Sequence, residues 1–141
     1  MKSFSVEIEI VAPAADIWSV LTDAARYTSW NSTVERVEGA IADGSRVTVF
    51  AKINPGRAFP LTVGHWLPPR RMMWSGGMPL GLFTGRRTFT LDAGQTITRF
   101  AMREEYSGLL APLITRSIPD LQPAFERFAA DLKARVEHGP R

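Results

Sequence analysis

Apolar and polar positions alternate from Phe4 to Ile10, the two-residue period that is typical of a half-buried β-strand. After Pro13, a residue suited to the first turn of a helix, apolar residues recur at helical spacing as far as Asp23. Asp23 is a suitable cap for a second short helix that continues to about Tyr27. The beginning of the chain therefore predicts one strand followed by two short helices.

After Trp30 the pattern becomes that of strands. The predicted strands cover about residues 33–41, 45–53, 58–67, 70–76, 83–92 and 95–106. The stretches between them are short and rich in turn residues, as at Asp43-Gly44 and Pro68-Pro69. Because short links join only antiparallel neighbours, we predict a six-strand meander that the first strand extends to a sheet of seven.

The end of the chain shows helical spacing again. One apolar stripe is formed by Leu121, Phe125, Phe128, Leu132 and Val136. The segment from Leu109 to about Ser117 is also predicted helical, and Pro119 and Pro123 divide it from the last helix. A sheet and a helix with one apolar face each bury those faces against one another. We therefore predict one α+β domain over residues 1–141, a curved antiparallel sheet around a long C-terminal helix.

Composition excludes several function classes. The chain has no Cys, which rules out disulfides, thiolate nucleophiles and cysteine-bound metals. Its 17 basic residues are spread along the chain, with only Arg70-Arg71 and Arg86-Arg87 adjacent, so we predict no nucleic-acid partner despite a net charge of +3. Because Glu7 and Glu9 interrupt the N-terminal apolar stretch and no segment is long enough to span a bilayer, we expect a cytoplasmic protein, and the Arg- and Ala-rich usage suits a GC-rich bacterial genome.

Strand alternation predicts which side chains face inward. If Ala93-Gly94 is a two-residue turn, the last two strands share one aromatic-rich face, which Tyr106 continues. That face carries Phe83, Gly85, Arg87, Phe89 and Leu91 opposite Glu104, Met102, Phe100, Thr98 and Thr96. By the same reasoning a second inward face carries Phe59, Leu61, Val63, His65 and Leu67 together with Met72 and Trp74. Since Trp66 and Met73 are apolar too, the alternative parity stays open for this second pair.

Four segments together resemble a known superfamily. They are residues 11–31, with Pro13, Trp18 and Trp30-Asn31; residues 68–74, Pro-Pro-Arg-Arg-Met-Met-Trp; residues 104–110; and residues 132–137. In this order they are similar to the START-like (SRPBCC) superfamily of polyketide cyclase/dehydrase and lipid-transport-like proteins, which have the Bet v 1-like helix-grip fold. The resemblance implies an internal cavity between sheet and C-terminal helix, and folds of this kind do not by themselves fix an activity.

The favoured function is binding of a small hydrophobic ligand, such as a lipid, a polyketide-like molecule or another apolar metabolite. The alternatives are a cyclase/dehydrase-type enzyme and a protein-interaction domain like the superfamily's chaperone activators. The candidate ligand-binding residues are Phe59, His65, Trp74, Phe83, Arg87, Phe89, Phe100, Met102, Glu104, Tyr106, Leu113 and Phe125. The aromatic residues among them would fill a solid core equally well, whereas Arg87 and Glu104 stand out because a charge on an apolar face is costly unless it is paired or near water.

Catalytic signals are weak. His65 is a candidate general base, with Glu104 or Tyr106 as the acid, yet a lone inward histidine is more often a hydrogen-bonded core residue. The only other histidine is His138, near the C-terminus, so we predict no metal site. No cofactor is predicted, a homodimer is compatible with the sequence, and a binding protein without catalysis is favoured over an enzyme. Trp18 and Trp30 are predicted to pack between the short helices and the sheet.

Overall fold

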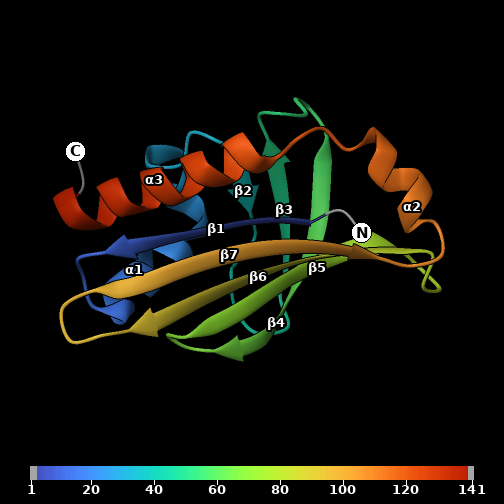
Figure 1. Ribbon diagram of the computed structural model, residues 1–141. Helices are drawn as coiled ribbons and strands as arrows, with labels where there is room; N and C mark the ends of the chain where they lie inside the picture. Colours follow the sequence, from blue (N-terminus) through green and yellow to red (C-terminus); the bar gives the residue numbers. More distant parts are fainter. Residues whose placement is uncertain (1–2, 140–141) are drawn as a thin grey trace.

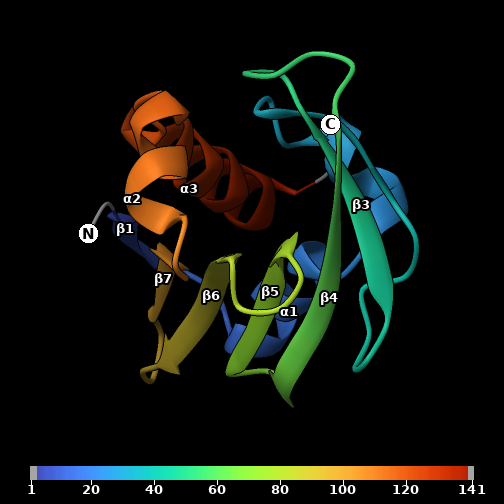
Figure 2. The same cartoon turned by 90° about the vertical axis from the view of Figure 1, so that its right-hand side faces the viewer.

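A seven-stranded antiparallel sheet curls around one long helix in the computed structural model, which describes residues 3–139 (Figures 1 and 2). The strands are β1 (Ser3–Ile10), β2 (Val34–Glu38), β3 (Arg46–Ala51), β4 (Ala58–Leu67), β5 (Arg71–Met78), β6 (Phe83–Ala93) and β7 (Thr98–Ser107). The helices are α1 (Ala14–Leu21), the 3₁₀ turn η1 (Ala24–Ser29), α2 (Ala111–Ile114), the 3₁₀ turn η2 (Thr115–Ser117) and α3 (Gln122–His138). The strand order is β1-β7-β6-β5-β4-β3-β2. The predicted helix-grip fold, with the first strand as the seventh strand of the sheet, is confirmed.

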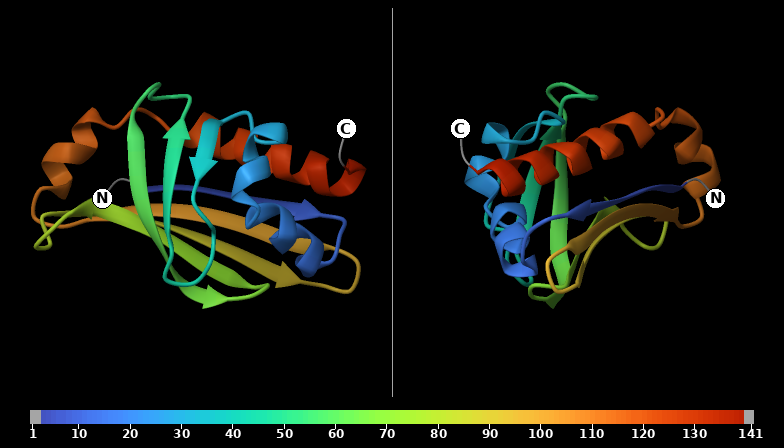
Figure 3. Two further views of the ribbon diagram at one scale, coloured as in Figure 1. Left: turned by 180° about the vertical axis from the view of Figure 1, so that it is seen from behind. Right: turned by 60° about the vertical axis from the view of Figure 1, so that its left-hand side comes forward.

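The helices divide the molecule into two ends, which Figure 3 shows from two sides. α1 and η1 cover one end of the sheet, and α2 lies at the other. α3 runs along the concave face between them and buries one stripe, in which Phe125, Phe128 and Leu132 are the large residues. This is the apolar stripe predicted from the sequence. We call the region where side chains of the concave face and of α3 meet the grip.

The turn between β6 and β7 is longer than predicted. Residues 94–97 form it, and Ala93 pairs with Thr98 where the two-residue turn would have paired Asp92 with Gln95. The longer turn moves the register by four residues along one strand, and because strand side chains alternate with period two, the same residues still face inward. The predicted inward face is therefore correct except for Thr96, which is exposed in the turn, while the predicted cross-strand partners are wrong. The true register places Arg87 directly opposite Glu104 and Gly85 opposite Tyr106.

The inward face predicted for β4 is wrong after Val63. Val63 pairs with Trp74 and is buried, but the register with β5 shifts between Gly64 and Leu67. His65 lies in this bulge with a φ of 47°, in the left-handed region, and its side chain is exposed. A bulge adds one residue to one strand, so the alternation restarts one position later. Trp66 consequently packs on Trp18 of α1, with ring centroids 5.1 Å apart, and His65 and Leu67 are excluded from the interior.

Candidate ligand-binding site

The grip is packed with aromatic rings at the end that η1 covers. Trp74 and Phe89 lie on neighbouring strands with ring centroids 4.7 Å apart, and Phe100 stacks on Phe128 of α3 at 6.2 Å. Tyr27 and Trp30 complete the cluster from η1, and Trp30 lies 5.6 Å from Phe128. All six rings are buried. We call this cluster the filled half of the grip; here the candidate residues Phe89, Phe100 and Met102 form a solid core.

The concave face carries charged side chains toward the α2 end. Arg87 Nη2 donates to Glu104 Oε2 at 3.2 Å, and the Tyr106 hydroxyl donates to the same oxygen at 3.0 Å. The Arg87 and Glu104 side chains keep 22% and 17% of their exposure although they face α3, so solvent reaches the inward surface at this level. This satisfies the expectation that charges on this face are paired and near water.

Aromatic side chains surround this network. The Arg87 guanidinium lies 4.7 Å from the ring centre of Phe125 on α3, a cation–π distance. Tyr106 stacks on Phe83, with centroids 5.8 Å apart and planes 14° from parallel. Its ring also covers Gly85, where an added Cβ would lie 3.5 Å from two ring carbons. We call the region formed by Phe83, Gly85, Arg87, Glu104 and Tyr106 the open half of the grip.

Two N–H donors at the boundary of the two halves have no acceptor among residues 3–139. They are Nε of Arg87 and Nε1 of Trp74, and both atoms are buried. Arg87 and Trp74 are register partners on β6 and β5, so the two donors belong to neighbouring positions on one face. Because a buried donor without a partner costs about 1 to 3 kcal/mol, this is the place in the grip where an acceptor atom would be most stabilising.

Burial and charge also fix the protonation of Tyr106. Burial raises the pKa of the Tyr106 phenol far above its ordinary value; the neighbouring Glu104 carboxylate and its hydrogen bond raise the pKa further, and Arg87 partly opposes them. The phenol therefore stays protonated near neutral pH and acts as a donor to Glu104. Burial likewise raises the pKa of Tyr27, whose hydroxyl donates to the Leu21 carbonyl.

The structure brings together part of the predicted site. Six of the candidate residues meet in or beside the open half: Trp74, Phe83, Arg87, Glu104, Tyr106 and Phe125. Phe59 is half-buried on β4, whereas His65 on its bulge and Leu113 on α2 are exposed, so neither lies in the interior. Sequence reasoning missed Phe4, whose ring lies 5.9 Å from Phe125 and 6.4 Å from Tyr106. The sequence did signal that Phe4 faces inward at the start of β1. Only the pairing of β1 with β7 places it beside Tyr106.

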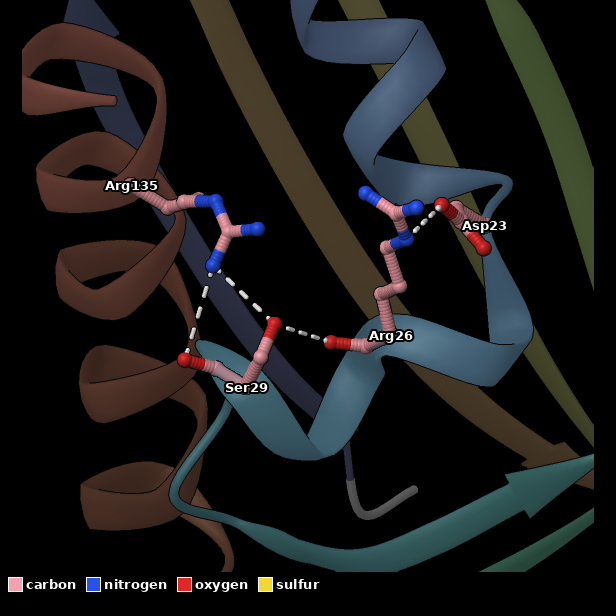
Figure 4. A network of polar contacts seen from close by, with 4 residues as sticks. All are labelled: Asp23, Arg26, Ser29 and Arg135. Atoms are coloured by element: carbon pink, nitrogen blue, oxygen red, sulfur yellow. Dashed lines mark hydrogen bonds and ion pairs between the residues drawn. The ribbon is translucent and has the colours of Figure 1, made fainter. Parts of the chain in front are cut away.

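Two hollows lie outside the grip. One, of about 290 Å³, is bordered by α1, η1 and the end of α3, and Figure 4 shows the polar contacts at its edge. There Arg135 Nη1 donates to Ser29 Oγ at 3.0 Å, and Arg26 lies 3.5 Å from Asp23. The Arg135–Ser29 contact fastens η1 to α3, whereas the Arg26–Asp23 pair lies within η1 and its N-terminal cap. The other, about 550 Å³, is a shallow groove mainly over outward residues such as Arg71, Thr88 and Arg103.

No group of three or more His, Asp or Glu side chains within residues 3–139 is placed to hold a metal ion. Over the same residues no helix has the length and apolar character needed to cross a membrane.

Comparison with known proteins agrees with this architecture. Residues 1–137 match the family described as polyketide cyclase / dehydrase and lipid transport. The chain belongs to this family. No curated protein matches the sequence. Because the family description covers both catalysis and transport, the side chains in the grip have to indicate which function this chain has.

Solved structures show the same fold at low sequence identity. A START superfamily protein from Mycobacterium smegmatis superposes with a TM-score of 0.68 at 18% identity, covering 96% of this chain and 97% of that one. The Aha1 dimer from Colwellia psychrerythraea gives 0.72 at 19% identity, covering 99% and 98%. The di-domain ARO/CYC BexL, from the BE-7585A biosynthetic pathway, gives 0.68 at 17% identity, covering 97% of this chain and 47% of that one.

Proposed function

We propose that this protein binds a small, largely apolar molecule in the open half of the grip, and that Arg87 and Trp74 hold an oxygen acceptor of that molecule. The observation that carries the proposal is the pair of buried, unpaired donors, Arg87 Nε and Trp74 Nε1, on neighbouring inward positions. The aromatic surfaces of Phe83, Tyr106 and Phe125 around them suit an apolar body. Membership of a family described by polyketide cyclisation and lipid transport supports the same class of ligand.

The charges of the network favour a neutral oxygen. Glu104 already accepts hydrogen bonds from Arg87 and from Tyr106, so the network has one positive and one negative charge close together. A ligand carboxylate would place a second negative charge beside Glu104, whereas a ketone or phenol oxygen would accept from the free donors without that repulsion. We therefore propose an oxygenated, uncharged ligand, such as an aromatic ketone or phenol, in preference to a free fatty acid.

The test uses Nile red, a neutral apolar dye, as the reporter of the grip. Aromatic ketones and phenols should displace the dye more readily than hydrocarbons of the same size or fatty acids. In Arg87→Met the side chain still packs on Phe125 but has no donor, and the affinity for a ketone should fall by about tenfold or more, the worth of a hydrogen bond to a charged group. Hydrocarbon affinity should change little.

A matched control lies outside the grip. Arg36 donates to Glu38 at 2.8 Å and its guanidinium lies 3.8 Å from the Phe50 ring centre, so it repeats the Arg–Glu–Phe arrangement on an exposed part of β2. Arg36→Met should leave displacement by every competitor unchanged. The proposal fails if Arg87→Met and Arg36→Met behave alike, or if ketone and hydrocarbon bind equally to the unaltered protein.

The second candidate function is a cyclase/dehydrase-type enzyme, and one arrangement favours it. Glu104 is a carboxylate beside the protonated Tyr106 phenol on the same inward face, which supplies a base and a donor next to the proposed ligand oxygen. Glu104→Gln and Tyr106→Phe separate the two functions. A ligand recovered unchanged after incubation indicates binding alone, whereas conversion that both variants abolish, with ligand affinity retained within a few-fold, indicates catalysis.

A further inference from the structure

Four large apolar side chains are exposed at the α2 end of the molecule. They are Met78, Leu80, Leu109 and Leu113, which we call the leucine tip. Leu80 is 92% exposed, Leu109 82% and Leu113 64%. Met78 ends β5, Leu80 lies in the β5–β6 loop, and Leu109 and Leu113 lie in the segment from β7 into α2. These segments lie at the same end of the sheet in Figures 1 and 2. Single exposed leucines are ordinary, but a cluster of them marks an interaction site.

Backbone contacts join these two segments into one surface. Leu109 N donates to the Gly81 carbonyl at 3.2 Å, and Leu110 N donates to the Leu82 carbonyl at 2.8 Å. Gly108 permits the close approach: its φ is 113°, and a Cβ there would lie only 2.6 Å from the Leu82 oxygen. The leucine tip is therefore a built feature of the fold, held by hydrogen bonds between segments distant in the sequence.

Stability of the folded chain does not explain a leucine at position 80. Leu80 has a φ of 62°, in the left-handed region that Gly and Asn occupy more readily. Its side chain is almost fully exposed, so it gains nothing from burial in this chain. Both the backbone and the solvent would favour a different residue. Neither its backbone conformation nor burial within the chain therefore accounts for a leucine at this position.

The surroundings of the leucine tip are basic. Residues 72–91, which lead into and out of the β5–β6 loop, contain Arg86 and Arg87 and no Asp or Glu, and residues 106–119 contain Arg116 and no acidic residue. Arg86 is exposed and donates to Ser107, directly before Gly108, while Arg116 is exposed directly after α2. Of the carboxylates that border residues 106–119, Glu104 is engaged with Arg87 and Tyr106, Glu105 lies 3.5 Å from Arg103, and Asp120 accepts from the Gln122 backbone N–H at 3.1 Å.

We infer that the leucine tip inserts into the interface of a lipid bilayer that contains anionic phospholipids. Protruding aliphatic side chains reach the acyl region, while cations beside them meet the headgroups, which is how peripheral proteins bind such surfaces. The tip is continuous with the open half of the grip through Leu82 and Phe83, so a ligand moving between bilayer and grip would pass it. That last step rests on the proposed function; the docking itself does not.

Vesicle flotation tests the inference without any internal ligand. The protein should float with vesicles of phosphatidylcholine mixed with phosphatidylglycerol, bind phosphatidylcholine alone more weakly, and lose part of its binding at high salt. The double variant Leu80→Asn, Leu109→Asn should lower the partition coefficient by about tenfold or more. Asn tolerates the left-handed backbone at position 80, so the variant should fold, which its thermal unfolding checks.

The control variant removes similar apolar exposure at the opposite end. Leu67 and Val11, at the far ends of β4 and β1, are 56% and 61% exposed, and Leu67→Asn, Val11→Asn should leave flotation unchanged. Failure of the unaltered protein to float with either vesicle, or equal losses in the two double variants, would overturn the inference. Two further results would overturn it if the protein does not bind vesicles. One is a dimer in sedimentation equilibrium that Leu80→Asn dissociates, and the other is a complex with an acidic carrier protein that the same variant dissociates.

Discussion

The two halves of the grip are built from the same strands and the same alternation of side chains, yet they differ in what faces α3. In the filled half, the rings of Phe89 on β6 and Phe100 on β7 contact Phe128, and Trp74 on β5 contacts Tyr27 of η1. Tyr27 and Trp30 in turn contact Phe128. In the open half the inward positions hold Arg87, Glu104 and Gly85, and the aromatic contacts there come from Phe4, Phe83 and Phe125. An inward strand position is therefore not by itself a core position, because the covering helices decide whether side chains there exclude water.

The difference also separates two kinds of unpaired polar atom. Trp30 Nε1 also lacks an acceptor, and Trp30 borders the hollow of about 290 Å³ outside the grip. Arg87 Nε and Trp74 Nε1 lack acceptors beside the open half, where the Arg87 and Glu104 side chains retain solvent contact. The Trp30 donor therefore does not belong to the concave face that carries the Arg87–Glu104 network. The second pair is where a ligand oxygen would be stabilised, which is why the proposed function is placed there.

The largest expected effect is on folding. Phe128→Ala should lower the free energy of unfolding by about 3 to 5 kcal/mol, because the ring contacts Tyr27, Trp30, Phe89 and Phe100 in a buried cluster. Phe83→Ala, its counterpart in the open half, loses the stack on Tyr106 and should cost about 1 kcal/mol. Urea denaturation followed by circular dichroism measures both. Equal losses would show that the two halves are packed alike.

The next effect is on stability at alkaline pH, and it uses the fact that the chain has two tyrosines, one in each half. Both folded pKa values are raised above the ordinary 10.0, mainly by burial. A raised pKa contributes stability that is present below pH 10.0 and is lost as the pH rises above it, because the unfolded chain then releases the proton first. Each tyrosine should steepen the loss by about 1.4 kcal/mol per pH unit.

Variants that keep only one tyrosine show which half of the grip causes this loss of stability at alkaline pH. In Tyr106→Phe the remaining Tyr27 should show tyrosinate absorbance only as the circular dichroism signal of the fold disappears, since its ring is fully buried. In Tyr27→Phe the remaining Tyr106, beside the partly exposed network, should ionise at a lower pH and before unfolding. If Tyr27 ionised before unfolding, the half that we describe as filled would have to admit water.

The fold could be predicted from the sequence because its signals are local and repeated. Strand alternation, the stripe of α3 and the short turns each depend on neighbouring residues, and the structure confirms them except in β4 after Val63 and at the 94–97 turn. The inward face of β6 and β7 was also predictable, since a register error of four residues leaves the faces unchanged. The Arg87–Glu104 pairing was not, because the length of the 94–97 turn decides it and Ala93-Gly94 gave a plausible shorter turn.

The bulge in β4 was the second feature that the sequence could not reveal. Val63, His65 and Leu67 alternate as a regular strand would, and the one local signal is Gly64, since an isolated glycine within a strand often marks a bulge but does not fix its position. Tertiary packing decides the matter, because Trp66 contacts Trp18 of α1, a residue 48 positions earlier. The division of the grip into filled and open halves is hidden for the same reason: it depends on where η1 and α2 cover the sheet.

The smallest expected effect concerns His65, the former candidate for a general base. His65 is exposed on the bulge, away from the open half, so His65→Gln should change neither ligand affinity nor any conversion of ligand beyond the error of the measurements. His65→Gly should raise the free energy of unfolding slightly, by less than about 1 kcal/mol, because glycine adopts a φ of 47° without the Cβ strain of histidine. Isothermal titration with an aromatic ketone and urea denaturation measure the two quantities. Loss of affinity in His65→Gln, with unchanged stability, would mean that the bulge turns into the grip when ligand binds, and would return His65 to the site.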